Sequence, residues 1–467
     1  MRRIVLAAAV AASLVSAAPA VASRTQLSVF EDDRLLVGSG DAAREQALDE
    51  MAALGVDVVH TVVGWGRVAP PGRKRPKGFD GADPASYPQE RWAPYDALVA
   101  GAQARGMRVM LAPAAPIPEW ASGCRGSAKV KRTCRPNPTH FRRFVEALAR
   151  RYPSVTMWAV WNEPNQGSWL SPQYELRGGR KVAVSPDLYR GLVRGALKGL
   201  KAAGHGRDEV LFGETAPLGR TTGALRIRPM PPKDFLEGVL CLRPAAGCDA
   251  PFPRLAVTAV GHHPYARGGS RSPAARGSAK EITIASVSRL KSILGRAAKR
   301  GRVKRNLPIW YTEYGLQTNP PDTIFGVPLD RQAAWINQAD WMAWRDPRVK
   351  AVAQYGLRDD SHSDGFQTGL RFADGRAKPA LAAYKLPIWV SRRGSGVTVW
   401  GQVRPATGTT DVEVQADDGA GFTTVQTVTT TSAGFLSAKL PTRARQYRLR
   451  WAGPGGAVLS RVAEVGR

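Results

Sequence analysis

Two glutamates stand where apolar, strand-like stretches of this chain end. Glu163 follows the run 155–161, and Glu313 closes the run 307–313. Pro164 cannot extend a hydrogen-bonded ladder, so we expect Glu163 at a junction between strand and loop. In parallel α/β barrels the catalytic groups lie at such carboxyl ends of strands. A pair of carboxylates on neighbouring strands is what retaining hydrolysis of a glycosidic bond requires.

The elements that would position these glutamates alternate along the chain. From about residue 26 to 390, strand-like apolar runs alternate with amphipathic helical stretches, which is typical of a parallel sheet with helical crossovers. Strands are expected at 27–30, 56–63, 108–112, 155–161, 209–213, 256–261, 309–313 and 349–356. Helices are expected at 43–54, 94–105, 139–151, 188–203, 282–300 and 331–344. The eight strands are the number that closes a (β/α)8 TIM barrel.

An open, doubly wound sheet is the alternative arrangement of the same α/β alternation. Sheets of that kind that bind dinucleotides carry a glycine-rich fingerprint directly after the first strand. Here the segment Gly38-Ser39-Gly40 follows the first strand, and it lacks the third glycine at the required offset. The sequence therefore favours the closed barrel.

The helical periodicity stops after Pro387, and short alternating segments replace it. Strands are expected there at 396–403, 412–416, 422–429, 434–440 and 447–451. This pattern predicts a small antiparallel β-sandwich. The expected parts are a signal peptide at 1–22, a catalytic barrel domain at 23–390 and an accessory sandwich domain at 391–467.

The role of the accessory domain has two interpretations. It is either a carbohydrate-binding module or a brace packed on the barrel. Its aromatic residues Trp400, Tyr447 and Trp451 sit in strand-like runs, where core packing accounts for them. The brace is therefore at least as well supported as the binding module.

The first residues have the composition of an export signal. Arg2 and Arg3 precede an apolar stretch at 4–15 and the small-residue cleavage site Ala20-Val21-Ala22. The mature chain is therefore expected to be secreted and extracellular. A membrane anchor is the weaker alternative, because the apolar stretch is short for a bilayer span and Pro19 interrupts it. No later segment of the sequence is long and apolar enough to span a membrane.

The chain is strongly basic. Its formal net charge of +29 becomes +27 (29 − 2) once Arg2 and Arg3 leave with the signal. Such a charge is typical of proteins that bind nucleic acids or other polyanions. The positive residues are nevertheless spread along the chain and form dense runs only at 73–77 and 129–135. We therefore expect no nucleic-acid partner, and electrostatic adsorption to acidic cell-wall polymers is a hypothesis that salt-dependent binding would test.

Four cysteines form two pairs that are close in sequence, Cys124 with Cys134 and Cys241 with Cys248. Export places the chain in oxidising surroundings, and two local disulfide bonds are the simplest connectivity, although other pairings stay open. A zinc site is less favoured, because neither spacing is Cys-x-x-Cys and no histidine accompanies the cysteines.

Three motifs carry a resemblance to a known family. They are Trp161-Asn162-Glu163-Pro164 on the fourth expected strand, Gly261-His262-His263-Pro264-Tyr265 on the sixth and Trp310-Tyr311-Thr312-Glu313-Tyr314-Gly315 on the seventh. With these motifs in this order, residues 26–390 resemble clan A of the glycoside hydrolases, especially families 5 and 39 with their cellulase-like and xylosidase-like enzymes. The resemblance implies a glycosidase that acts on an oligo- or polysaccharide without a metal or other cofactor. It also implies that Glu163 is the acid/base and Glu313 the nucleophile.

The two glutamates need different protonation states. Glu313 must be ionised to attack the anomeric carbon, whereas Glu163 must begin protonated to donate to the leaving oxygen. Two carboxyl groups roughly 5 Å apart disfavour each other's ionisation. Burial of Glu163 would help to keep the shared proton on that residue.

The resemblance assigns further roles around the pair. Asn162 would hydrogen-bond the sugar 2-hydroxyl, an interaction that strengthens in the transition state. Tyr265 would hold the nucleophile, and His263 would form a polar wall of the same subsite. Adjacent strand residues point in opposite directions, so only one of His262 and His263 can face the pocket, and we expect it to be His263.

Aromatic side chains near the strand ends are candidates for stacking on sugar rings, with core packing as the other interpretation of each. They are Trp65, Trp120, Trp161 and Trp169. A further group, Trp335, Trp341 and Trp344, lies on a helical pattern and is expected on the outer shell of the barrel.

Two positions depart from the clan pattern. The second strand of clan members usually carries an arginine beside the nucleophile, and His60 stands in its place here. His60 would then be a weaker, pH-dependent cation that supports Glu313. The eighth strand often ends in a pocket tryptophan, where this chain offers Gln354 and Tyr355.

Two functions of other classes stay open. A non-catalytic glycan-binding or cell-wall-binding protein on a degenerate barrel is compatible with His60, but the intact Glu163 and Glu313 argue against it. A polyanion binder rests on net charge alone. Hydrolysis that depends on Glu163 would separate the enzyme from both.

Overall fold

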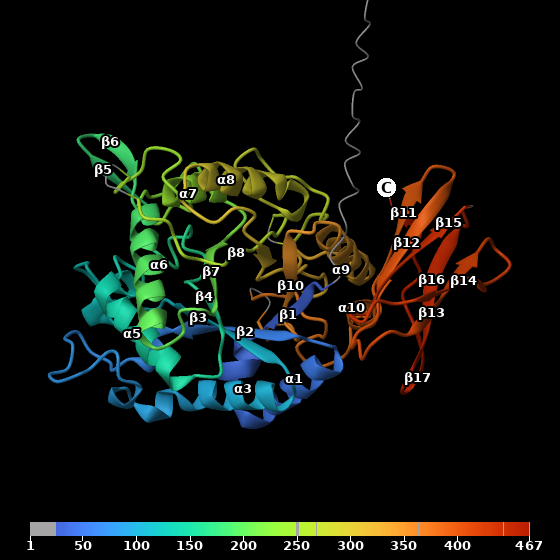
Figure 1. The fold of residues 1–467 in the computed structure, drawn as a ribbon, viewed down its shortest axis with the longest axis horizontal. Helices are drawn as coiled ribbons and strands as arrows, with labels where there is room; N and C mark the ends of the chain where they lie inside the picture. The colour runs from blue at the N-terminus through green and yellow to red at the C-terminus, as the bar shows by residue number, and fades with distance from the viewer. Residues whose placement is uncertain (1–24, 249–251, 268, 363–364, 442, 467) are drawn as a thin grey trace, which may run out of the picture.

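The structure, a computed structural model, describes residues 25–248, 252–267, 269–362, 365–441 and 443–466 (Figure 1). The predicted signal peptide lies outside the described residues. Within them, no helix is long and apolar enough to cross a membrane.

Eight parallel strands close a barrel in the order β1-β10-β9-β8-β7-β4-β3-β2. They are β1 (Leu27–Glu31), β2 (Val58–Gly64), β3 (Arg108–Ala114), β4 (Met157–Ala159), β7 (Glu209–Thr215), β8 (Ala259–His262), β9 (Ile309–Tyr311) and β10 (Val349–Tyr355). The ring closes where β1 pairs with β10, Leu27 opposite Ala351. Each strand lies on one of the expected stretches, so the predicted TIM barrel is confirmed.

The strands form where β-branched and apolar residues run without interruption. In β2 every residue from Val58 to Gly64 is buried, because side chains fill the barrel inside and helices cover it outside. β4 and β9 are shorter than expected and end at Ala159 and Tyr311. The chain therefore leaves the ladder before it reaches the two glutamates.

Helices surround the barrel, and Figure 1 shows them as an outer layer. The longer ones are α1 (Asp41–Ala53), α3 (Ala93–Ala104), α5 (Pro138–Arg151), α6 (Ser185–Ala202), α7 (Pro232–Val239), α8 (Ser288–Lys299), α9 (Leu329–Trp344) and α10 (Pro379–Lys385). Short turns lie at α2 (Trp65–Val68), α4 (Ala128–Lys131), η1 (Arg34–Gly38), η2 (Pro84–Ser86), η3 (Gln89–Arg91), η4 (Glu119–Ala121) and η5 (Ile284–Ser286). Neither α7 nor α10 was expected, and both begin at a proline in the first turn, where a missing N–H costs no hydrogen bond.

The C-terminal region forms two four-stranded sheets, ordered β15-β12-β11-β18 and β14-β13-β16-β17. Their bounds are β11 (Ile388–Arg393), β12 (Gly396–Gln402), β13 (Asp411–Asp417), β14 (Thr423–Thr429), β15 (Phe435–Leu440), β16 (Gln446–Gly453), β17 (Gly456–Leu459) and β18 (Val465–Gly466). All pairs are antiparallel except β11 with β18. The expected antiparallel sheets are confirmed, with β11, β17 and β18 in addition.

Helix α9 joins the barrel to the first C-terminal sheet. Trp344 of α9 packs on Trp400 of β12 at 5.8 Å between ring centroids, and Trp341 packs on Trp389 at 5.6 Å. In Figure 1, α9 and α10 lie beside these strands. Two of the three tryptophans expected on an outer shell, Trp341 and Trp344, therefore contact the C-terminal sheet.

Two disulfide bonds link Cys124 with Cys134 and Cys241 with Cys248, which confirms the local pairing. The first one ties the loop after β3. The loop after β4 carries an additional hairpin, β5 (Tyr174–Arg177) with β6 (Arg180–Ala183), that lies outside the barrel ring.

Candidate active site

The turn after β4 aims Glu163 into the barrel mouth. Trp161 and Glu163 both have left-handed backbone conformations, with φ of +72° and +35°. Residues other than glycine rarely adopt such values, and they cluster at functional sites. The side chain of Glu163 keeps 21% of its surface exposed.

Glu313 follows β9 and is more deeply set, with 10% of its side chain exposed. Its Oε1 atom accepts a hydrogen bond of 2.7 Å from the hydroxyl of Tyr265. Tyr265 follows β8, so neighbouring strands supply the carboxylate and its donor. This contact is the one that the sequence assigned to Tyr265.

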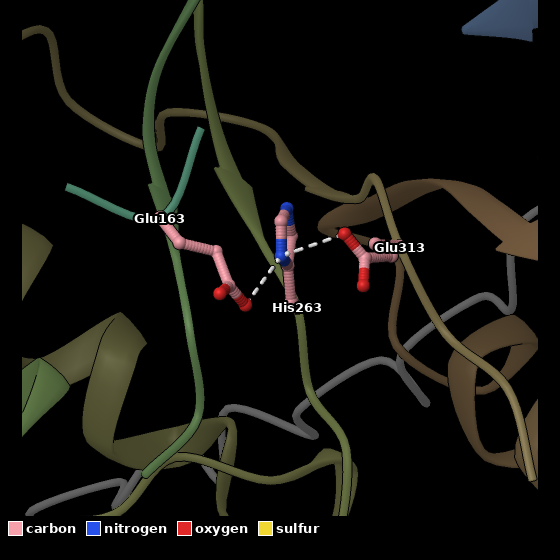
Figure 2. Close-up of side chains that lie close together, drawn as sticks. All are labelled: Glu163, His263 and Glu313. Carbon is pink, nitrogen blue, oxygen red and sulfur yellow. Dashed lines mark hydrogen bonds and ion pairs between the residues drawn. The ribbon is translucent and has the colours of Figure 1, made fainter. Parts of the chain in front are cut away.

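His263 lies between the two glutamates (Figure 2). Its Nδ1 atom is 3.1 Å from Oε1 of Glu163 and 3.2 Å from Oε2 of Glu313. Its Nε2 atom is 3.4 Å from Oε2 of Glu214, a fully buried carboxylate at the end of β7. Both ring nitrogens thus face acceptors, which requires a proton on each of them.

Gly261 makes room for this arrangement. A Cβ atom at that position would lie 1.5 Å from Oε1 of Glu214. The glycine of the β8 motif therefore allows Glu214 to approach the backbone and reach His263.

Surrounding carboxylates determine the charge of His263. Burial disfavours the imidazolium, but Glu313, Glu163 and Glu214 together raise the pKa of His263 well above its usual value. His263 is therefore a cation at neutral pH. It is fully buried and does not line the cavity, so it acts on a ligand through the glutamates and not as an exposed wall.

The pKa of Glu313 is raised to about 8. Burial is the main cause, and the negative charges of Glu31 and Glu163 add to it, whereas His263 and the Tyr265 hydroxyl oppose it. We expected burial to act on Glu163, but Glu313 is the more buried of the two. The free site therefore favours a proton on Glu313 near neutral pH, whereas the expected split places that proton on Glu163.

A cavity of about 490 Å³ opens above the two carboxylates. Of the residues expected to bind substrate, Asn162, Tyr265 and Tyr355 line it. Its other lining residues are Glu31, Asp33, Val62, Gln166, Trp169, Ala216, Pro217, Leu218, Gly219, Arg220, Pro229, Glu281 and Phe366. The Oδ1 atom of Asn162 is buried and has no hydrogen-bond partner among the described residues, so it is available to a ligand hydroxyl.

The structure corrects two of the tryptophan assignments. Trp65 is fully buried and stacks on Phe144 at 5.6 Å, because α2 turns the indole toward the helical layer. Trp161 is also fully buried, and its Nε1 atom donates to the backbone oxygen of Trp169. Neither lines the cavity. Trp65 and Trp161 therefore support the site from behind, and Trp169 is the tryptophan that reaches the cavity.

His60 is likewise not a substrate contact. It is fully buried, and its Nδ1 atom lies 2.7 Å from Oε2 of Glu31. The expected support for Glu313 comes from His263 instead, since His60 faces β1. The adjacent His262 is structural: burial, with a smaller contribution from the charge of His263, lowers its pKa to about 3, although its hydrogen bonds with Thr215 and the backbone oxygen of Ile282 oppose the shift.

Glu31 and Asp33 are cavity residues that the sequence analysis missed. Glu31 is the last residue of β1, and Asp33 lies two residues beyond it. The rule that catalytic groups lie at strand ends, which was applied to other strands, would therefore have found them. Burial and the neighbouring Glu31 raise the pKa of Asp33 to about 7. Leu218, Glu281 and Phe366 come from long loops, where no periodic pattern predicts the path.

The site also presents a group of possible ligands for a cation. One ligand atom each from Glu163, His263 and Glu313 lies within 4.8 Å of the others. A metal ligand must be a neutral imidazole, whereas the carboxylates around His263 hold it protonated. The donor set therefore fits a hydrogen-bonded acid/base site better than a metal site.

Comparisons with known proteins bear on the family and the fold. The family profile of the cellulases (glycosyl hydrolase family 5) matches residues 25–348. No curated protein matches the chain. A family 39 glycoside hydrolase from the gut symbiont Bacteroides cellulosilyticus WH2 is similar in structure, with a TM-score of 0.52 and 15% identity over 90% of this chain and 80% of that one. GH5_18 from Streptomyces cattleya, in complex with GlcNAc, has a TM-score of 0.49 and 17% identity over 78% and 79%.

The likeness to the family 39 enzyme bears on the fold alone. The family profile covers nearly the whole barrel, including the three motifs and both glutamates. The chain is therefore a glycosidase, and it belongs to glycoside hydrolase family 5, the cellulase family.

Proposed function

We propose that this chain is an exported, retaining glycosidase that hydrolyses O-glycosidic bonds of an oligo- or polysaccharide. The observation that carries the proposal is the approach of the two glutamates, with one carboxylate oxygen of each within 4.8 Å of the other. Retaining enzymes hold their two carboxyl groups at about 5 Å, whereas inverting enzymes leave room for a water molecule between them.

In the first step Glu313 attacks the anomeric carbon, and the bond from that carbon to the glycosidic oxygen breaks. Glu163 gives its proton to the leaving oxygen. The products are a glycosyl ester on Glu313 and a released alcohol. The cation on His263 offsets the single negative charge of the pair, which lies on Glu313 before the attack and on Glu163 after it.

In the second step Glu163, now ionised, takes a proton from water, and the water oxygen attacks the anomeric carbon. The ester bond to Glu313 breaks, and the site returns to its starting state. Tyr265 stabilises the carboxylate of Glu313 as it departs, through the 2.7 Å hydrogen bond. Asn162 offers its unpartnered Oδ1 to the 2-hydroxyl of the sugar.

The working form of the free enzyme holds one proton on the carboxylate pair. For attack, that proton must lie on Glu163. The Nδ1 atom of His263 is about equally distant from both carboxylates, at 3.1 and 3.2 Å. Substrate that displaces water and contacts Glu163 would therefore shift the proton over a short distance within one hydrogen-bonded group.

The same proposal covers the organisation of the chain. Residues 1–22 are the export signal, 23–390 the catalytic domain and 391–467 an accessory domain that braces helix α9. Both disulfide bonds are compatible with an oxidising, extracellular location. The brace follows from the tryptophan contacts across α9.

Parallel kinetics of Glu163→Ala and Glu313→Gln on aryl β-glycosides and polysaccharides test the mechanism. Glu313→Gln should lose turnover of every substrate. Glu163→Ala should still react with an aryl glycoside whose leaving group needs no proton, and azide should restore its turnover by trapping the ester. EDTA should not change the rate at which the wild type hydrolyses aryl β-glycosides or polysaccharides.

An equal loss of turnover in Glu163→Ala and Glu313→Gln, without rescue of Glu163→Ala by azide, would contradict the assigned roles. Binding of glycans by a folded wild type that turns over no substrate would favour the non-catalytic alternative.

A further inference from the structure

A second cavity, of about 860 Å³, continues the active-site cavity along the barrel mouth. The two cavities share Gln166, Trp169, Arg220 and Pro229. We call the second cavity the basic groove, after its cationic lining residues. These are Lys129, Arg132, Arg220, Arg226 and Arg228. No carboxylate occurs among its described lining residues.

The active-site cavity has the opposite character. Its lining carboxylates are Glu31, Asp33, Glu163, Glu281 and Glu313. Arg220, at the border with the basic groove, is the one cation among the described residues that line it. A ligand that spans both cavities therefore meets negative charge at the bond to be cleaved and positive charge beyond it.

The cations of the basic groove form no ion pair with a carboxylate of the described residues. The nearby Lys131 and Arg135 pair with Glu119 and Glu175. In contrast, Lys129, Arg132 and Arg220 form no side-chain hydrogen bond or ion pair within the described part of the chain. Two further arginines donate only to backbone oxygens, Arg226 to Val130 and Arg228 to Gly223. Five positive charges in one groove thus lack a counter-charge among the residues that the structure describes.

The walls of the groove are fixed. The Cys124–Cys134 disulfide bond closes the loop that carries Lys129 and Arg132. The backbone N–H of Ser171 donates to the oxygen of Thr133 at 2.9 Å, which joins this loop to the one after β4.

The third wall of the basic groove is the loop that carries Arg226 and Arg228, and it too packs closely on its neighbour. A Cβ atom on Gly167 would lie 2.4 Å from the Cα atom of Ile227, so the loop that carries Arg226 and Arg228 lies directly against the loop after β4. The groove is therefore built into the loops in the absence of a ligand.

The position of Glu163 indicates which part of the substrate would lie in the basic groove. Gln166 and Trp169, which both cavities share, follow Glu163 in the same loop. Tyr355 lies at the end of β10, opposite β4 in the ring. Since the acid/base protonates the leaving oxygen, the leaving part of the substrate departs past Glu163 and into the basic groove.

We propose that the basic groove binds an anionic saccharide as the leaving part of the substrate, while the sugar transferred to Glu313 carries no negative charge. This inference rests on the proposed function. The ligand chemistry is that of a carboxylate or sulfate group on a sugar, which arginine and lysine recognise by charge-assisted hydrogen bonds. A uronic acid at the point of cleavage would face the carboxyl groups of Glu31 and Asp33, and Arg220 at the border is the one cation among the described residues that line this cavity.

Calorimetric binding to the full-length chain with Glu313→Gln, which suppresses turnover, tests this proposal. The probes are a trisaccharide of galacturonic acid, a sulfated galactose trisaccharide and neutral cellotriose. We expect at least one acidic probe to bind about tenfold more tightly than cellotriose at low salt. The preferred acidic probe identifies the anionic group.

Two charge-matched triple variants locate the site. Lys129→Gln with Arg132→Gln and Arg220→Gln should weaken binding of the acidic probe by about tenfold. The control, Arg392→Gln with Arg393→Gln and Lys439→Gln, removes three exposed charges from the C-terminal sheet and should not change the affinity. Circular dichroism verifies that both variants fold.

Three results would overturn the proposal. They are equal binding of acidic and neutral probes, equal loss in the two triple variants, and displacement of the acidic probe by a deoxythymidine 10-mer as strong as by the probe itself. The last would mean a general attraction for polyanions. Because these are binding measurements, they stand apart from the hydrolysis assays, so a failure of the catalytic proposal is recognised separately.

Discussion

The imidazole of His60 lies 2.7 Å from the carboxylate of Glu31, and both side chains are buried. Burial opposes the charged form of His60, but Glu31, with smaller contributions from Glu214 and Asp33, raises the pKa of His60 to about 9. His60 is therefore a cation at neutral pH. It acts on Glu313 only by offsetting Glu31, one of the charges that raise the pKa of Glu313.

Replacing His60 should change the pH dependence of stability. A raised pKa in the folded state stabilises the protein fully below about pH 6.5, the unfolded value, and this contribution is lost as pH rises through about 9. His60→Gln removes one partner of a buried pair and should cost about 3 kcal/mol at pH 6. The cost should shrink by pH 9.5, as urea denaturation would measure. His362→Gln, at an exposed histidine, is the control, and an equal cost at both pH values would contradict the prediction.

Activity should have an alkaline limit set by the carboxylate pair. The pair needs one proton to work, and the pKa of Glu313 is about 8. We therefore expect kcat/KM, which reports the free enzyme, to fall as pH rises through about 8. Initial rates at low substrate between pH 4 and 10 would check this. Constant kcat/KM up to pH 10 would mean that the pair keeps no proton in that range.

Tyr265→Phe should slow the reaction and shift its pH profile. The hydroxyl favours the ionised form of Glu313, so without it the pKa of Glu313 rises and the alkaline limit moves to higher pH. The lost donor should lower kcat by about 100-fold. Tyr314→Phe is the matched control, because Tyr314 stacks on Tyr265 at 5.7 Å and its hydroxyl has no partner among the described residues. A similar shift of the profile in Tyr314→Phe would point to packing instead.

Glu313→Gln should make the protein more stable. A carboxyl group whose pKa is raised in the folded state stabilises the protein at low pH, and this contribution is lost as pH rises from about 4.5 to about 8. The amide keeps the shape without that loss, so the variant should gain about 1 kcal/mol at pH 8 and little at pH 4. Urea denaturation of the variant beside Glu90→Gln, at an exposed glutamate, would measure this. A variant less stable than wild type at pH 8 would contradict the raised pKa.

Local patterns predicted the barrel because its strands are uninterrupted apolar runs. They did not predict β11, where Pro387 precedes the strand and Arg392 and Arg393 end it, so the segment reads as a loop. At the site, Glu163 and Glu313 were predictable because strand ends and motif spacing locate them. The burial of Trp65 was not, since it depends on the direction in which the short helix α2 turns the side chain.

Residues around Glu163 and Glu313 likewise divide into those that a local motif predicts and those that only the folded chain brings to the site. Tyr265 shares a motif with its strand, whereas Phe366 reaches the cavity from a loop after β10. The pairing of His60 with Glu31 depends on the register between β2 and β1, which only the closed ring determines. Motifs therefore predict the position of the paired carboxylates, and tertiary packing determines which groups shift their pKa values.

The buried ion pair between Arg404 and Asp340 should couple the C-terminal sheets to the barrel. Arg404 donates to Oδ2 of Asp340 in α9 and to the backbone oxygen of Tyr384, both at 3.1 Å, and lies over the Tyr384 ring at 4.4 Å. Arg404→Met leaves Asp340 buried without its partner, which should cost about 3 kcal/mol. Adding Asp340→Asn should recover part of this loss, because the two changes remove one interaction. Arg450→Met, in a more exposed pair with Glu413, should cost under about 1 kcal/mol. Urea unfolding, followed by tryptophan fluorescence, measures the stability of the wild type, of Arg404→Met, of the double variant and of Arg450→Met. An early transition of the C-terminal sheets in Arg404→Met, with the barrel transition unchanged, would show that the brace does not stabilise the barrel.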